Sequence, residues 1–470
     1  MFSSLTALSL PGRKARRLAA AALVSALAAA GVVTGAGPAV AAQDAAARGQ
    51  GGATATIGGL KTHGLAVIHG ADGDHEVPAG LFEMSVEGGG TLQTYCVDIQ
   101  NPTQKDAKYQ ETPWSGTSLG TNKDAGRVRW ILQNSYPQVN DLAALAKKAG
   151  VRGGLTEQDA AAGTQVAIWR YSDDTDVEAV DPQAERLADH LEKSARDLAE
   201  PAASLSLDPP AVSGRPGERI GPVTVRTNAD GATVTPPVDA TTGGVRIVDK
   251  KGEPVTSVTN GSQIFFEVPE DAAAGTADLT VQASTTVPVG RAFASESRSQ
   301  TQILAGSSES TVAATASATW ADRGPIPALS ARKNCAEGAL DITAVNKGDE
   351  PFTFELLDTE YTIEAGETRT VTVPLPEDRA YDFTIRGPAG LEQRFTGVLD
   401  CRTQSAALAD TTRPLGEPAP TEVVTPTPTP DPNLAETGSS GATPLIGGAA
   451  IGLVVIGGAV LLFLRRRNER

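Results

Sequence analysis

Short runs of alternating apolar and polar residues, separated by turn-forming residues, fill the second half of the chain and limit it to β structure. Examples are Val223–Arg226, Ile264–Val268 and Arg369–Val373. Alternation with period two places one face of each run against a core, and clusters of Gly, Pro and Asp end each run after a few residues. The pattern predicts two immunoglobulin-like β-sandwiches, over residues 203–320 and 325–402.

Residues 50–202 combine strand-like and helical patterns, which predicts an α+β domain ahead of the two sandwiches. Thr91–Ile99 alternates in the manner of a strand. Apolar residues at helical spacing and capping residues predict helices at three places: Asp124–Ser135, Thr156–Tyr171, and a segment that begins at Asp181 and Pro182. Thr156 and Asp159 form a loose version of the capping box at the start of the second helix.

The first 41 residues have the pattern of a signal peptide. A basic region is followed by an Ala-rich apolar run, and Ala39-Val40-Ala41 matches the small-residue cleavage pattern. The basic residues are Arg13, Lys14, Arg16 and Arg17. A first transmembrane helix is the alternative, but Gly and Pro interrupt the run. We therefore expect the protein to be secreted.

The other end of the chain has the features of an envelope anchor. Leu445–Leu464 is apolar without a charge and precedes Arg465–Arg467, which predicts a transmembrane helix with a cytoplasmic basic tail. Upstream, residues 403–433 are rich in Pro and Thr and end in a Thr-Pro repeat, so we expect an extended linker across the cell wall.

Leu434–Gly438 reads LAETG and stands just before the apolar segment. This order of pentapeptide, apolar span and basic tail, over residues 434–470, resembles the sorting signal of Gram-positive sortase substrates. The LAxTG form is similar to class E substrates of actinobacteria. The resemblance implies that sortase cuts between Thr437 and Gly438 and joins Thr437 to peptidoglycan. A plain single-pass anchor is the alternative reading.

The excess of acidic over basic residues argues against a nucleic-acid partner. The chain has 56 acidic and 40 basic residues, for a formal net charge of −16. Such a surface repels nucleic acid and favours solubility. No nucleotide-binding or nucleic-acid-binding motif is present, so we expect no nucleic-acid partner and no cofactor.

Three cysteines give the sharpest chemical constraint. Cys335 and Cys401 bracket the second predicted sandwich, and in an exported domain that placement predicts a disulfide between them. Cys96 is then left over. An odd cysteine in an oxidising compartment pairs with another molecule, is a buried inert thiol, or takes part in chemistry.

A second polar residue stands in an unexpected place. Gln165 lies in the middle of the apolar face of its predicted helix, with Ala161 and Ala162 one turn before it and Ile168 and Trp169 one turn after. A buried amide without partners costs on the order of 1–3 kcal/mol. Hydrogen bonds to neighbouring backbone are one explanation.

Three blocks of sequence together resemble the bacterial thioester domains of Gram-positive surface adhesins, the TQxA or Cys-Gln family. The blocks are Tyr95–Asp98, Arg129–Pro137 and Thr164–Trp169, and the resemblance covers roughly residues 53–200. It implies an α+β thioester domain at the N-terminal tip, with the side chains of Cys96 and Gln165 joined. Thr164 is the first residue of the third block.

The residue types suit that chemistry. A Cys96 thiolate can attack the Gln165 carboxamide and expel ammonia, which leaves a thioester. A lysine amine on a surface or matrix protein would then attack the carbonyl, form an isopeptide bond and free the thiol. We expect a single-use crosslink without turnover, and therefore no enzyme. Tyr95 and Trp169 are candidates to shield the bond, and the role of Asp98 is open.

The sequence also suggests alternative functions and sites. A cysteine peptidase or transamidase would need a histidine beside Cys96. A structural wall protein without covalent activity is a further alternative. His63, His69 and His75 lie near acidic residues but lack zinc-ligand spacing, so we expect no metal site. Glu267 could belong to an isopeptide crosslink, although no motif accompanies it.

Overall fold

The computed structural model describes residues 51–71, 73–99, 101–236 and 244–402. These residues fall within one compact unit, 1–411. The predicted signal peptide (1–41), linker (403–433) and sorting signal with its apolar span (434–470) lie outside the described residues. Within the described ranges, no helix is both long enough and apolar enough to cross a membrane.

A seven-stranded antiparallel sheet forms the centre of the N-terminal region, in the order β2-β3-β15-β14-β4-β1-β5. An additional pairing of β2 with β1 closes six of these strands into a ring. The strands are β1 (Thr54–Gly70), β2 (Gly73–Val86), β3 (Thr91–Cys96), β4 (Lys108–Thr112), β5 (Val177–Ala179), β14 (Ala292–Ser295) and β15 (Gln302–Ser307).

The described residues include four α-helices in this region: α2 (Ala125–Asn134), α3 (Leu142–Ala149), α4 (Glu157–Ser172) and α5 (Pro182–Ser194). Helices α2, α4 and α5 contact the sheet, and α3 packs against α5. Two short 3₁₀ turns, Trp114–Gly116 and Ser118–Gly120, precede them. Helix α4 contacts β1, β2 and β3 as well as α5, and most of its middle is buried. It begins at a reciprocal capping box, in which Thr156 and Asp159 each bond the other's backbone N–H.

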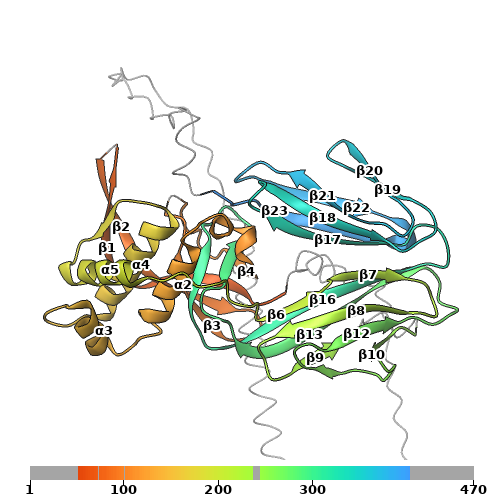
Figure 1. The fold of residues 1–470 in the computed structure, drawn as a ribbon, viewed down its shortest axis with the longest axis horizontal. Helices are drawn as coiled ribbons and strands as arrows, with labels where there is room; N and C mark the ends of the chain where they lie inside the picture. Colours follow the sequence, from red (N-terminus) through yellow and green to blue (C-terminus); the bar gives the residue numbers. More distant parts are fainter. Residues whose placement is uncertain (1–50, 72, 100, 237–243, 403–470) are drawn as a thin grey trace, which may run out of the picture. The chain divides into compact units, whose positions relative to one another are not determined.

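Two further sheets follow in the chain (Figure 1). One has the order β10-β12-β8-β6 and the other β11-β9-β13-β16-β7. Their strands are β6 (Leu205–Asp208), β7 (Ala211–Gly214), β8 (Arg219–Thr227), β9 (Ala232–Thr235), β10 (Arg246–Asp249), β11 (Ser257–Val258), β12 (Gln263–Glu267), β13 (Gly275–Thr286) and β16 (Glu309–Trp320). Val223, Phe266 and Val281 are among the buried residues of the core they share.

Residues after 325 form a third group of short sheets. Strands β17 (Pro327–Asn334), β18 (Ala339–Asn346) and β21 (Thr368–Pro374) make one sheet. Strands β19 (Phe352–Leu356) and β20 (Thr359–Ile363) form a pair, as do β22 (Ala380–Arg386) and β23 (Glu392–Val398), with a 3₁₀ turn at Pro388–Gly390 between the last two. A disulfide joins Cys335 to Cys401. The described chain is thus mostly β with few helices, and the immunoglobulin-like classification stays a prediction.

Strands β14 and β15 depart from the arrangement expected of residues 203–320. β13 and β16 pair along their whole length, and the chain between them, residues 287–308, leaves their sheet. It contributes β14 and β15 to the seven-stranded sheet instead, where β14 pairs with β4 and β15 pairs with β3. In Figure 1 this is the green ribbon that runs beside the orange strands. We call residues 287–308 the inserted hairpin.

The inserted hairpin suits the interior of a sheet because its strands are apolar on both faces. Ala292, Phe293, Ile303, Leu304 and Ala305 are all fully buried. Residues that are buried on both faces belong to a central strand covered by other elements, rather than to a half-exposed one. Both apolar faces of these strands are therefore buried because the strands lie inside the larger sheet.

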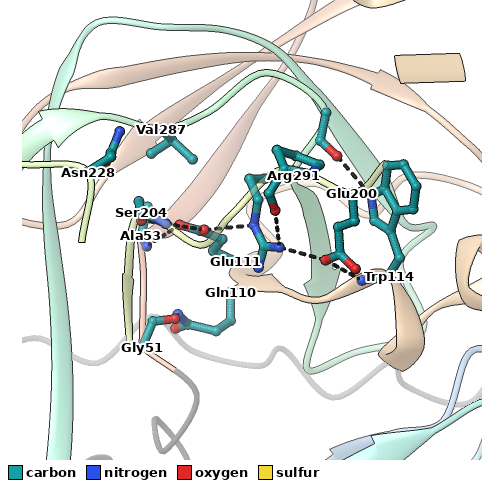
Figure 2. Close-up of polar contacts among 12 residues, drawn as sticks. Gly51, Ala53, Gln110, Glu111, Trp114, Glu200, Ser204, Asn228, Val287 and Arg291 are labelled. Carbon is teal, nitrogen blue, oxygen red and sulfur yellow. Dashed lines mark hydrogen bonds and ion pairs between the residues drawn. The ribbon is translucent and has the colours of Figure 1, made fainter. Parts of the chain in front are cut away.

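A buried ion network fixes the start of the inserted hairpin (Figure 2). The Arg291 guanidinium donates from Nε to Glu111 Oε1 at 2.9 Å and from Nη1 to Glu200 Oε1 at 2.6 Å. Glu111 also accepts from the backbone N–H groups of Ala53 and Ser204, at 3.2 and 2.9 Å. The network therefore joins β4, the N-terminal end of β1, the 200–204 connection and β14.

Removing one partner of this network should be costly. Arg291→Met leaves the buried Glu111 carboxylate without its cation, and such a change costs about 3–5 kcal/mol. We expect a large fall in the melting temperature, measured by calorimetry, and a smaller one for the double variant Arg291→Met, Glu111→Gln. Arg386→Met is the control, since its ion pair with Glu392 is exposed and should contribute at most about 1 kcal/mol. Equal effects of Arg291→Met and Arg386→Met would contradict the assignment.

Candidate functional site

Cys96 lies at the end of β3, directly opposite Gln302 on β15. The Cys96 side chain is a buried free thiol, and Gln302 is fully buried. Gln302 Nε2 donates to Cys96 Sγ at 3.3 Å, although the two residues are 206 positions apart in the sequence. The inserted hairpin therefore brings a carboxamide to the one unpaired cysteine of the chain.

The backbone geometry favours close contact of these two side chains. The N–H and C=O of Cys96 both bond to a partner other than β15. The next ladder bond runs from Val97 N to Thr301 O, at 3.2 Å. Cys96 and Gln302 thus form a non-hydrogen-bonded cross-strand pair, the type in which opposing Cα atoms are about 4.5 Å apart and side chains are closest.

Gln165 is the partner of the Cys96 backbone. Cys96 N donates to Gln165 Oε1 at 3.0 Å, and Gln165 Nε2 donates to Cys96 O at 2.9 Å. Strand β2 pairs with β3 only as far as Thr94, so it does not reach Cys96 on this side. The side-chain amide of Gln165 takes the place of a strand neighbour there. This accounts for a fully buried glutamine on the apolar face of α4.

The structure therefore brings both glutamines to Cys96, but to different parts of it. The carboxamide of Gln165 is bonded at both ends to the Cys96 backbone. The carboxamide of Gln302 contacts the sulfur through Nε2, and its Oε1 accepts from Thr94 Oγ1 at 2.9 Å. Gln302 was not among the site residues predicted from the sequence. The only local signal was a glutamine directly before the apolar run Ile303–Ala305, within the first predicted sandwich.

Burial controls the protonation of the sulfur. It raises the pKa of the Cys96 thiol to about 12, with smaller contributions in the same direction from the nearby carboxylates of Asp173 and Asp98. Hydrogen bonds from Gln302 and Thr103 act in the opposite direction. At neutral pH the group is therefore a thiol, and any attack by the sulfur must include loss of its proton.

A second buried acid lies near the thiol. Burial raises the pKa of Asp173 to about 7, although the Ser172 hydroxyl and the Ile99 N–H donate to its carboxylate at 2.6 and 3.0 Å. Asp98 is buried as well, and its carboxylate accepts a hydrogen bond from Asn101 Nδ2. Both carboxyls are close enough to affect the pKa of the Cys96 thiol.

The other predicted site residues lie in the core around Cys96. Tyr95 is fully buried and donates from its hydroxyl to Tyr136 O at 2.8 Å. Trp169 is buried in the same hydrophobic cluster as Cys96. Thr164 Oγ1 donates to Ala160 O at 2.7 Å, one turn earlier in α4. These residues belong to the buried core beside Cys96, and none of the three is hydrogen-bonded to the sulfur.

Comparison with known proteins agrees with part of this picture. Residues 93–203 match the family model described as "Thioester domain", and residues 326–398 match the model of the bacterial phospholipase C, C-terminal domain. No curated protein matches the chain. The first match contains Cys96 and Gln165, whereas Gln302 lies beyond it.

Three solved structures show weak overlap. The Bacillus anthracis TIE protein is 13% identical, with 75% of this chain and 81% of that one covered and a TM-score of 0.27. The thioester domain of the Enterococcus faecium TIE86 protein is 15% identical, with coverages of 57% and 97% and a TM-score of 0.27. The E. coli chaperone DraB is 12% identical, with coverages of 42% and 98% and a TM-score of 0.15. Overlap at these TM-scores is too low to support a common fold. The similarity that remains is the match of residues 93–203 to the thioester domain family.

Proposed function

We propose that Cys96 and Gln302 form an internal thioester. The observation that carries the proposal is the 3.3 Å contact between Cys96 Sγ and Gln302 Nε2, made by side chains on directly opposed residues of β3 and β15. In the reaction the Sγ–Cδ bond forms and the Cδ–Nε2 bond breaks. The thiol proton leaves with the nitrogen, which is released as ammonia.

A bond between Cys96 and Gln165 is the second candidate, and the match of residues 93–203 to the thioester domain family favours it because that range contains both residues. The hydrogen bonds oppose it. Using Gln165 as the acyl group would expel Nε2, the donor to the buried C=O of Cys96, as ammonia. Each buried backbone group left unpaired costs about 1–3 kcal/mol. Gln302 can react without that loss.

The thioester would serve as a covalent attachment group. An amine, such as a lysine side chain of a surface or matrix protein, attacks the Gln302 carbonyl, forms an isopeptide bond and releases the Cys96 thiol. The burial of both residues keeps water from the bond until a partner arrives. Each molecule reacts once, so the protein would act as an adhesin and not as an enzyme. A peptidase reading lacks support, because among the described residues no histidine forms a hydrogen bond with Cys96.

Intact-mass spectrometry tests the crosslink and identifies the acyl residue. The purified exported chain should be lighter than its disulfide-bonded sequence mass by one ammonia. Cys96→Ser and Gln302→Ala should each show the full mass of the substituted chain, because one reacting group is missing. Gln165→Ala should lose ammonia only in part, since the Cys96 backbone is no longer held. Glu267→Gln, on β12, is the control and should retain the complete mass loss.

Two outcomes would count against this assignment. Full sequence mass with a free thiol in freshly prepared wild-type protein would leave the structural, non-covalent reading. Complete ammonia loss in Gln302→Ala, together with none in Gln165→Ala, would instead establish the Cys96–Gln165 bond.

We also propose that the protein is exported and joined to peptidoglycan by sortase. The support is the order of sequence features: a signal-peptide pattern at 1–41, LAETG at 434–438, an apolar span and a basic tail. The two predicted immunoglobulin-like sandwiches and the Pro/Thr-rich linker would then hold the reactive domain away from the wall.

Cell fractionation tests the anchor. Thr437→Ala removes the residue whose carbonyl sortase would transfer, so the variant should appear in the medium or the membrane. Wild-type protein should instead be released from the wall by muramidase. Thr425→Ala, in the linker, should fractionate as wild type. Covalent recovery of the Thr437→Ala variant with peptidoglycan would exclude the sortase route.

A further inference from the structure

The hydroxyl of Thr94 is in contact with the proposed reacting group, and neither the sequence motifs nor the proposed function gives it a role. Thr94 lies on β3, two residues before Cys96, and is fully buried. Its Oγ1 donates to Gln302 Oε1 at 2.9 Å. Residues two apart on a strand have side chains on the same face, so Thr94 and Cys96 both reach the Gln302 carboxamide.

The two contacts are made with different atoms of the Gln302 carboxamide. The sulfur lies at the nitrogen, which is the group that leaves, and the Thr94 hydroxyl lies at the oxygen. When the sulfur adds to Cδ, negative charge develops on that oxygen. A hydrogen-bond donor placed there in advance, in a buried site, stabilises the transition state. The loss of one such donor typically slows a reaction on the order of 10²-fold or more.

No other side chain in the described part of the protein donates a hydrogen bond to Gln302 Oε1. The two nearest backbone donors are bonded to other acceptors. The Cys96 N–H donates to Gln165 Oε1, and the Val97 N–H donates to Thr301 O. The oxygen of the proposed acyl group therefore depends on a single hydroxyl.

We propose that Thr94 is a catalytic residue whose hydroxyl stabilises the oxyanion at Gln302 Oε1, an inference that rests on the proposed Cys96–Gln302 thioester. The donor acts twice. It serves first when Sγ attacks and ammonia leaves, and again when an amine attacks the thioester carbonyl. In the second step the C–N bond forms, the Cδ–Sγ bond breaks, and a proton from the amine ends on the sulfur.

Variants of the full exported chain separate this role from simple packing. Thr94→Val keeps the shape and removes the donor, Thr94→Ser keeps the donor and removes a methyl group, and Thr94→Ala removes both. Thr319→Val is the matched control, a buried threonine on β16 in the neighbouring sheet. The readouts are the time course of ammonia loss by intact mass and the rate constant for methylamine addition to the thioester that has formed.

Thr94→Val and Thr94→Ala should slow both reactions on the order of 10²-fold. Thr94→Ser and Thr319→Val should react at close to the wild-type rates. If Thr94→Val fails to fold, Thr94→Ala provides the same comparison with Thr94→Ser. Wild-type rates in a folded variant without the hydroxyl would overturn the inference, and so would an equal slowing in Thr94→Ser. The absence of any ammonia loss in wild-type protein would instead refute the thioester itself.

Discussion

The pairing of β3 with β15 is the interaction on which the rest of the site depends, because it sets Cys96 opposite Gln302. That register exists only because residues 287–308 leave the sheet of β13 and β16 and complete a sheet built mainly from residues before 180. Two features keep the inserted hairpin in place: strands that are apolar on both faces, and the buried Arg291–Glu111 ion pair at its start. The proposed thioester would add a covalent bond across the same pair of strands.

The two glutamines act on opposite sides of Cys96, and their different hydrogen bonds explain why both are buried. Gln165 satisfies the backbone of the cysteine where no strand does so, which holds the residue in an extended conformation. Gln302 presents its nitrogen to the sulfur and its oxygen to Thr94. Strand β3, helix α4 and the inserted hairpin each supply one part of this arrangement, and the parts meet at Cys96.

Sequence reasoning succeeded where the signal is local. The capping box of Thr156 and Asp159 and the helix start at Asp181 follow from contacts between residues a few positions apart, and both are present in the structure. The inserted hairpin could not be predicted in this way, because alternation shows that a segment is a strand and not which distant strand it pairs with. Gln165 attracted attention because it interrupts a helical apolar face, whereas Gln302 stands at the edge of an apolar run, where a polar residue is ordinary.

The most direct test of the central claim is to locate the amine adduct. The exported chain is treated with methylamine, digested, and sequenced by tandem mass spectrometry, with Cys96 alkylated after the reaction to detect the released thiol. The account predicts one N-methylated glutamine, at Gln302, and one newly alkylated cysteine in the same molecules. Methylation at Gln165, or at neither residue with the Cys96 thiol free from the start, would contradict it.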